Sequence, residues 1–291
     1  MRVFVTGATG WVGSAVVQEL LSAGHEVTGL SRSEEGAAAL AEAGAQVRRG
    51  LVGDLDLLKD AAGAADGVIH CAFNHDFSRF LENCAEDERA IGALASALAG
   101  KPLLVTSGMA LIAPGRLADE DDVTAPHFPR RSEAGAKAAA AKGVKAGAVR
   151  LPPSVHGLGD HGFVPRLIQI ARDKGAAAYI GDGANRWSGV HRLDAARVYR
   201  LALEQGVTQP TYHAVGDEGV PFKEIAAVIG KHLGVPVVSK SVEEAEAHFG
   251  WLAPFAGMDL AASGEKTKAL LGWAPQQPGL IADLDQPGYF S

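Results

Sequence analysis

A glycine-rich turn near the start of the chain constrains the fold more than any other feature. The apolar run Val3 to Val5 leads into Thr-Gly-Ala-Thr-Gly-Trp-Val-Gly at residues 6–13, and an apolar helical pattern, Ala15 to Leu21, follows. In this order, glycines permit a tight turn, a close approach to a pyrophosphate and tight packing of helix on strand, and the helix N-terminus offers N–H donors to an anion. The alternative is a purely structural turn. We predict dinucleotide binding, with these candidate contacts: Gly7, Thr9, Gly10, Trp11, Val12 and Gly13.

The first half of the chain alternates short β-branched runs with alanine- and leucine-rich stretches of helical length. This alternation is typical of βαβ units that build a parallel sheet. A barrel would need about eight regular repeats, so the pattern favours an α/β fold with an open, doubly wound Rossmann sheet. The expected strands are 2–6, 25–30, 46–50, 67–71, 102–106 and 146–150, and the expected helices are 11–23, 34–43, 55–63, 83–99 and 132–143.

The rhythm changes after residue 150, where Leu151-Pro152-Pro153 ends the last of these strands. The second half reads as loops and helices with one short strand at 211–215. Its expected helices are 163–173, 192–204, 221–234, 242–250 and 263–272. We therefore expect a nucleotide-binding domain over 1–155, joined by 190–216. A small C-terminal substrate-binding cap would comprise 156–189 and 217–291, with the ligand cleft between the two.

Composition narrows the possible partners. The 291 residues include 27 basic and 34 acidic side chains, a net charge of −7, which argues against nucleic acid. Two cysteines, Cys71 and Cys84, cannot form a disulfide framework, and no ligand spacing indicates a metal site. No apolar run reaches the roughly eighteen residues of a membrane span. We expect a cytoplasmic protein with a small-molecule substrate.

Several motifs together resemble the extended short-chain dehydrogenase/reductase family, in an atypical form. Besides the glycine turn, these are Gly53-Asp54-Leu55, His70-Cys71-Ala72-Phe73, Arg150 to Gly157, Val190 to Asp194, and Leu270 to Pro275. The resemblance implies a Rossmann fold, a bound nicotinamide nucleotide and often a homodimer. It also implies cofactor contacts: Asp54 and Leu55 at the adenine; Cys71, Ala72 and Phe73 at the inner ribose and phosphates; Pro152, Pro153 and Val155 at the nicotinamide.

The end of the second expected strand bears on the choice of nucleotide. An acidic residue there selects NAD by bonding the ribose 2′-hydroxyl, whereas this chain has Ser31, Arg32 and Ser33. A guanidinium flanked by hydroxyls suits a 2′-phosphate, so NADP(H) is predicted over NAD(H). The alternative is a solvated arginine, with Glu34 and Glu35 close by.

The family's catalytic Tyr-x-x-x-Lys pair is absent. None of the tyrosines at 179, 199, 212 and 289 has a lysine four residues later. One alignment puts His127 and Arg131 in the tyrosine and lysine places, and another puts Glu133 and Lys137 there. We favour the first, because His127 can donate a proton near neutral pH and Arg131 can bind ribose hydroxyls. A surface histidine is the competing interpretation.

Further polar residues are candidates for the chemistry. The family serine falls on Ser107, or on Gly108 in another register. His75 beside Asp76 forms either an acid/base pair or the N-cap of the next helix. His156, Asp160 and His161 are expected over the nicotinamide, and Asn185-Arg186-Trp187 with His191 in the cap.

These features favour an NADP(H)-dependent oxidoreductase that reduces a small carbonyl or imine-type compound. Two alternatives stay open. One is a nucleotide-sensing regulatory protein without turnover. The other is an epimerase, dehydratase or isomerase that uses bound nucleotide.

Overall fold

The fold is known from a computed structural model that describes residues 1–109, 112, 115–125 and 128–291. Its centre is a parallel seven-stranded sheet with the order β10-β6-β5-β4-β1-β2-β3. The strands are β1 (Arg2–Thr6), β2 (Glu26–Ser31), β3 (Gln46–Arg49), β4 (Gly67–His70), β5 (Pro102–Gly108), β6 (Lys145–Leu151) and β10 (Thr211–His213).

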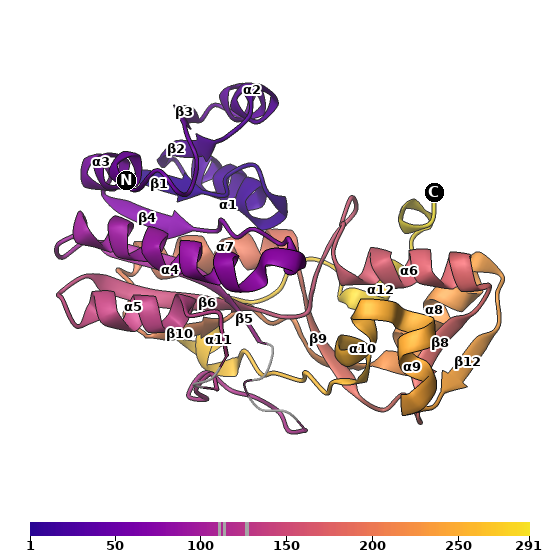
Figure 1. Ribbon diagram of the computed structural model, residues 1–291. Coiled ribbons are helices and arrows are strands. Elements are labelled where there is room, and N and C mark those ends of the chain that lie inside the picture. The colour runs from indigo at the N-terminus through magenta and orange to yellow at the C-terminus, as the bar shows by residue number, and fades with distance from the viewer. Residues whose placement is uncertain (110–111, 113–114, 126–127) are drawn as a thin grey trace.

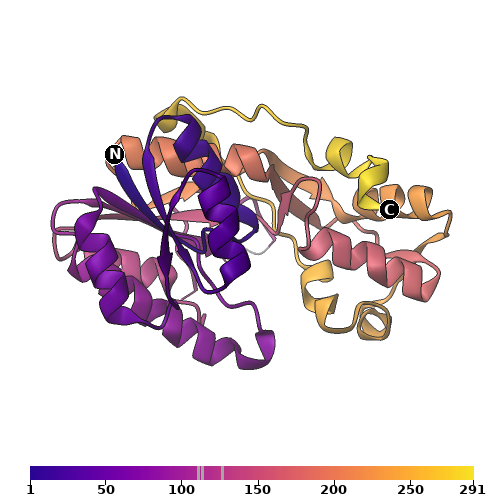
Figure 2. The ribbon, with the colours of Figure 1, turned by 90° about the horizontal axis from the view of Figure 1, so that it is seen from above.

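Helices cover both faces of this sheet (Figures 1 and 2). On one face α1 (Trp11–Ser22) packs on α7 (Arg192–Glu204), and on the other α4 (Phe80–Ser96) lies between α3 (Leu55–Ala64) and α5 (Ser132–Ala140). Each face has its own buried apolar core. α2 (Glu34–Glu42) follows β2 near the edge of the sheet. The predicted doubly wound α/β fold is confirmed, although α4 begins three residues before the helix expected at 83–99.

The C-terminal lobe, which we call the cap, lies beside the carboxyl ends of the central strands (Figure 2). It contains a three-stranded sheet, β11-β9-β7, and a two-stranded sheet, β12-β8, around a separate core. Its strands are β7 (Ser154–His156), β8 (Ala177–Ile180), β9 (Arg186–His191), β11 (Asp217–Pro221) and β12 (Val237–Lys240). Its helices are α6 (Phe163–Lys174), α8 (Phe222–Leu233), α9 (Val242–Phe249), α10 (Ala253–Gly257) and α12 (Leu280–Leu284), whereas α11 (Glu265–Leu271) packs on α7 and β10.

The expectation of loops and helices in the second half was wrong, because five strands there had no clear signal. β9 reads Arg-Trp-Ser-Gly-Val-His and β11 reads Asp-Glu-Gly-Val-Pro, without the alternation or β-branched run of a strand. The strands of the cap pair with segments that are distant in sequence. Ser154 of β7 pairs with Gly189 of β9, and Val237 of β12 pairs with Ala177 of β8. Such short strands are specified by tertiary contacts more than by local propensity.

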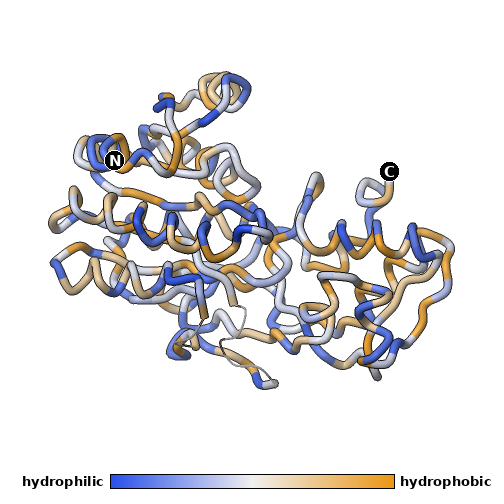
Figure 3. Tube along the Cα trace, viewed as in Figure 1, coloured by the Kyte–Doolittle hydropathy of each residue, from blue (hydrophilic) through white to orange (hydrophobic). Residues whose placement is uncertain are grey.

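Hydropathy follows this layering, with hydrophilic residues recurring along the outer helices (Figure 3). Among the helices described, none is long and apolar enough to cross a membrane.

Candidate active site and nucleotide cleft

A large cleft of about 2230 Å³ runs between the carboxyl ends of the central strands and the cap. At one end it is lined by residues after β3 and β2 and by the turn between β1 and α1, and residues after β4, β5 and β6 follow along the edge of the sheet. The cap contributes residues from the β7–α6 connection and from α10. Open α/β sheets bind their ligands at this edge, so the cleft is the candidate site.

The glycine turn has the geometry that the sequence predicted. Gly7 has φ +64°, and a Cβ there would lie 2.6 Å from the Ala72 nitrogen. A Cβ on Gly13 would lie 2.0 Å from the Gly7 oxygen, so this glycine lets α1 pack against the turn. α1 starts without a side-chain cap, which leaves its first N–H groups free to bind an anion. These residues fit the pyrophosphate of a dinucleotide.

Trp11 connects the nucleotide turn to the cap. Its indole Nε1 donates to the Val155 carbonyl at 2.7 Å, and the Arg192 guanidinium lies 4.1 Å above its ring. The His161 ring meets it edge-on, with centroids 5.7 Å apart. Trp11, Asp160 and His161 all line the cleft.

At the end of β2, Arg32 lines the cleft, whereas the two predicted serines are engaged in the start of α2. The Ser31 hydroxyl donates to the Ser33 carbonyl at 3.0 Å, and the Ser33 hydroxyl accepts from the Gly36 amide at 3.1 Å. The Glu34 carboxylate is paired with Arg49. Arg32 is thus the group of this trio that faces a ligand.

Asp54 and Leu55 do not line the cleft. The Asp54 carboxylate accepts from the Leu51 amide at 2.8 Å, and 50–52 line the cleft instead. The other predicted contacts that line it are Thr9, Gly10, Val12, Cys71, Ala72, Phe73, Pro152, Pro153 and Val155.

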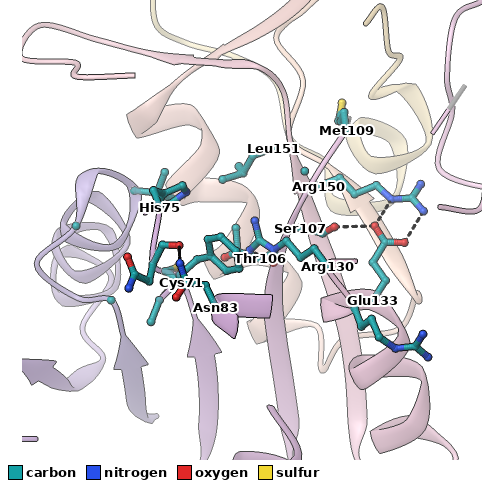
Figure 4. Close-up of a pocket in the computed structure, with 18 of the residues that line it drawn as sticks. Cys71, His75, Asn83, Thr106, Ser107, Met109, Arg130, Glu133, Arg150 and Leu151 are labelled. Carbon is teal, nitrogen blue, oxygen red and sulfur yellow. Dashed lines mark hydrogen bonds and ion pairs between the residues drawn. The ribbon is translucent and has the colours of Figure 1, made fainter. Parts of the chain in front are cut away.

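Further along the cleft, a carboxylate accepts four hydrogen bonds, and Figure 4 shows those from Ser107 and Arg150. Glu133 accepts from the Ser107 hydroxyl at 2.8 Å and from the Thr124 hydroxyl at 2.9 Å. Arg150 donates to both of its oxygens at 2.8 Å. Burial opposes ionisation of Glu133, but these hydrogen bonds and the Arg150 charge lower its pKa overall. Glu133 is therefore a carboxylate at neutral pH.

The Arg150 guanidinium is fixed from several sides. It is 1% exposed, donates to the Asp122 carbonyl at 2.7 Å and lies 3.1 Å from His213 Nε2. A buried bidentate ion pair with satisfied donors holds its partner carboxylate in one orientation. Glu133 is thereby aimed at Ser107.

A second network runs beneath the cleft from the glycine turn to Arg130. His70 lies 2.7 Å from the Thr6 hydroxyl and 3.1 Å from Asp87, which accepts from Ser132 at 2.6 Å. Arg130 donates to the Ser132 hydroxyl at 3.0 Å and to the Thr106 carbonyl at 2.9 Å. Its guanidinium lies 4.0 Å from the Phe73 ring centroid. A fixed positive charge thus lies on the wall of the cleft.

The alignment that we favoured is untested at its first residue, because His127 lies outside the described residues. Arg131 lines the cleft but is 53% exposed in its side chain and pairs with Glu88 at 3.3 Å. The residue that contacts Ser107 is Glu133, from the other alignment. Sequence reasoning missed Arg130, which carries no spacing signal.

His75 lines the cleft beside Phe73, with ring centroids 5.2 Å apart. Desolvation and then the charge of Arg130 lower its pKa, which favours the neutral imidazole. Asp76 caps the 3₁₀ turn Phe77–Arg79 by accepting from the Ser78 amide, so its N-cap role is confirmed.

Cys71 and the tyrosines are not positioned for acid/base work. Burial raises the pKa of the Cys71 thiol to about 12, as expected for an unreactive small residue. The Tyr199 hydroxyl is buried against Thr106 at 2.8 Å, and Tyr289 bonds Asp283. The described cleft is lined by no tyrosine.

Several residues expected near the ligand are structural instead. The Asn185 amide donates to the Ala256 and Met258 carbonyls, and Arg186 pairs with Asp259. Trp187 is fully buried, and His156 lies 2.9 Å from Asp283. These residues lie in the cap but do not line the cleft, because their side chains are engaged in contacts that hold the cap together. Among the described residues, no cluster of three His, Cys, Asp or Glu side chains is arranged to hold a metal ion.

Comparison with known proteins assigns the chain to a family. Residues 3–215 match the model of the NAD dependent epimerase/dehydratase family. An uncharacterized protein of Schizosaccharomyces pombe is 49% identical, with both chains covered in full. The 2-alkyl-3-oxoalkanoate reductase of Stenotrophomonas maltophilia is 27% identical, over 83% of this chain and 78% of its own.

Among solved structures, DesIV, a dTDP-glucose 4,6-dehydratase from Streptomyces venezuelae with NAD and TYD bound, shares the fold. It has a TM-score of 0.75 and 22% identity, over 98% of this chain and 96% of its own. The chain belongs to the NAD-dependent epimerase/dehydratase family of extended short-chain dehydrogenases/reductases, and it is an NAD(P)-dependent enzyme of that superfamily.

Proposed function

We propose that the protein is an NADP(H)-dependent oxidoreductase that reduces a small carbonyl or imine-type compound. The observation that carries this proposal is one continuous cleft with the glycine turn at one end and the Ser107–Glu133 pair further along. Bound nicotinamide supplies the hydride. The relative named as an oxoalkanoate reductase supports a carbonyl substrate.

The preference for NADP(H) depends on Arg32. This arginine lines the cleft at the end of β2, the position from which an acidic side chain would select NAD. The carboxylate of Glu34 is neutralised by Arg49, so it does not compete strongly for the Arg32 charge. Ser31 and Ser33 shape the turn that presents Arg32.

Proton transfer runs through Ser107 and Glu133. In reduction, a protonated Glu133 donates its proton to Ser107 Oγ over the 2.8 Å contact while the Ser107 hydroxyl passes its own proton to the substrate oxygen; in oxidation the protons move in the reverse direction and end on the Glu133 carboxylate. Because Glu133 is ionised at neutral pH, it serves as the base when an alcohol is oxidised. Reduction uses its protonated form, so the reductive rate rises as pH falls. Arg130 supplies the fixed positive charge that a lysine supplies in relatives.

The test is a titration of purified protein with NADPH and NADH, followed by NADPH oxidation over a panel of ketones, aldehydes, quinones and imines. We expect tighter NADPH binding and turnover of a panel member. Ser107→Ala should lower kcat by about 100-fold with unchanged NADPH affinity. The matched control is Ser96→Ala, whose hydroxyl only bonds the Ala93 carbonyl within α4. Tight binding without turnover of any panel member would contradict the proposed carbonyl or imine reduction and favour the nucleotide-sensing alternative.

A further inference from the structure

Aromatic rings line the part of the cleft that the nucleotide turn and the Ser107–Glu133 pair leave for a substrate. The cap contributes Phe163 from α6, Phe255 from α10, and Trp251 from the 3₁₀ turn Gly250–Leu252. The Phe163 centroid lies 4.9 Å from that of Phe255 and 6.1 Å from that of Trp251. From the larger domain come Phe80 and Phe128, with centroids 6.3 Å apart. Two aromatic walls thus border one space.

The cap wall is held by hydrogen bonds from β9 and from Asn185, which precedes it, to the backbone of 255–260. Asn185 donates to the Ala256 and Met258 carbonyls at 2.9 and 3.0 Å. The Trp187 indole donates to the Phe255 carbonyl at 3.1 Å, and Ser188 to the Leu260 carbonyl at 2.8 Å. These bonds fix the backbone that carries Phe255, so its ring is preorganised. Beside it the Trp251 ring meets the Phe255 ring edge-on, with centroids 6.5 Å apart, and 56% of Trp251 is exposed.

The polar groups of the cap are too few for a sugar nucleotide. Among the described cap residues that line the cleft, Arg166 alone has a permanent positive charge, and Asp160 adds a carboxylate that would repel phosphate. Asn185 does not line the cleft, and its amide nitrogen donates to two backbone carbonyls. A planar apolar ligand matches this wall better than a diphosphate does.

We propose that the substrate is a planar aromatic or conjugated carbonyl compound. Its ring lies against Phe163, Trp251 and Phe255, and its carbonyl oxygen reaches Ser107. This inference depends on the proposed reductase function. Stacked and edge-to-face rings gain about 0.5–1.5 kcal/mol per pair beyond area burial, which is roughly a twofold to twelvefold gain in affinity.

The experiment compares benzaldehyde with cyclohexanecarbaldehyde, which has the same carbon skeleton without the aromatic ring. At saturating NADPH we expect kcat/KM to favour benzaldehyde by about tenfold, although conjugation makes its carbonyl less electrophilic. Trp251→Leu and Phe163→Leu should each raise KM for benzaldehyde about threefold to tenfold, with less effect on cyclohexanecarbaldehyde. The control is Val242→Ala, an exposed apolar residue of the cap that does not line the cleft.

Equilibrium binding of benzaldehyde to the NADP⁺ complex separates this inference from the reductase function. Binding that weakens in Trp251→Leu, without turnover by NADPH, would contradict the reductase and uphold the aromatic site. Equal turnover of both aldehydes, unchanged in Trp251→Leu and Phe163→Leu, would overturn the aromatic site and leave the reductase standing. Preferential binding of UDP-glucose would also overturn the aromatic site.

Discussion

The two ends of the cleft hold their functional residues by different means. At the nucleotide end the backbone itself dictates the residues, because a Cβ on Gly7 or Gly13 would overlap neighbouring backbone atoms. At the reaction end the residues are chosen by their partners: Glu133 is fixed by Arg150 and bonded to Ser107. A local backbone requirement is visible in a sequence, whereas a pairing between α5 and β6 is not.

The largest expected effect tests the backbone requirement at the nucleotide end. Gly13→Ala puts a Cβ 2.0 Å from the Gly7 oxygen, so α1 must shift away from the turn. We expect a loss of about 3 kcal/mol in the free energy of unfolding and no measurable NADPH binding. Gly92→Ala, at a position on α4 with open space around it, is the matched control and should be neutral or stabilising. Equal behaviour of the two variants in urea denaturation would refute the packing argument.

The next effect tests the pairing at the reaction end. Glu133→Ala leaves Arg150, which is 1% exposed, without its carboxylate. An unpaired buried charge should lower the free energy of unfolding by about 3 kcal/mol, and Glu133→Gln should lower it less because an acceptor remains. The measurement is urea denaturation of both variants at pH 7. A loss in Glu133→Ala no larger than in Glu133→Gln would contradict the assigned pairing.

A smaller effect tests the preference of the nucleotide end for NADPH over NADH. Arg32→Ala removes the charged donor that faces the cleft after β2, and charged hydrogen bonds contribute about 1.5–3 kcal/mol. We expect the Kd for NADPH to rise roughly 10-fold to 100-fold while that for NADH stays the same. Arg48→Ala, an exposed arginine on β3 outside the cleft, is the control. A rise of the same size for NADH would remove the 2′-phosphate role.

The smallest effect concerns pH. The folded protein lowers the pKa of Glu133, so its ionised form stabilises the fold above the unfolded pKa of about 4.3, and this contribution is lost as pH falls through the folded value. The stability difference between wild type and Glu133→Gln should therefore shrink as pH falls from about 5 to 3. A constant difference across this range would mean that Glu133 is not stabilised as a carboxylate.

The same contrast explains which parts of the fold could be predicted from the sequence. The glycine turn and the first-half strands follow from local patterns, whereas Phe73 and Pro152 were implied by the family resemblance, and both residues line the cleft. Strand β9 was not predicted because it pairs with Ser154 of β7 and Asp217 of β11, which are remote from it in sequence.

Only part of the candidate site could be predicted from the sequence. Glu133 had a signal, the spacing of four residues to Lys137, but His127 and Arg131 have the same spacing, so spacing alone could not rank Glu133 above His127. Arg130 had no signal in the sequence. Its position depends on hydrogen bonds to Ser132 and to the Thr106 carbonyl, which only the folded structure reveals.

The central claim is that Ser107 and Glu133 form the reactive pair. The most direct measurement is kcat at saturating NADPH for Glu133→Gln and for the double variant His127→Ala/Arg131→Ala, with the NADPH Kd measured for each. We predict that Glu133→Gln loses about 100-fold or more in kcat with unchanged Kd, and that the double variant stays within about twofold of wild type. The reverse pattern, with full activity in Glu133→Gln and its loss in the double variant, would contradict the account.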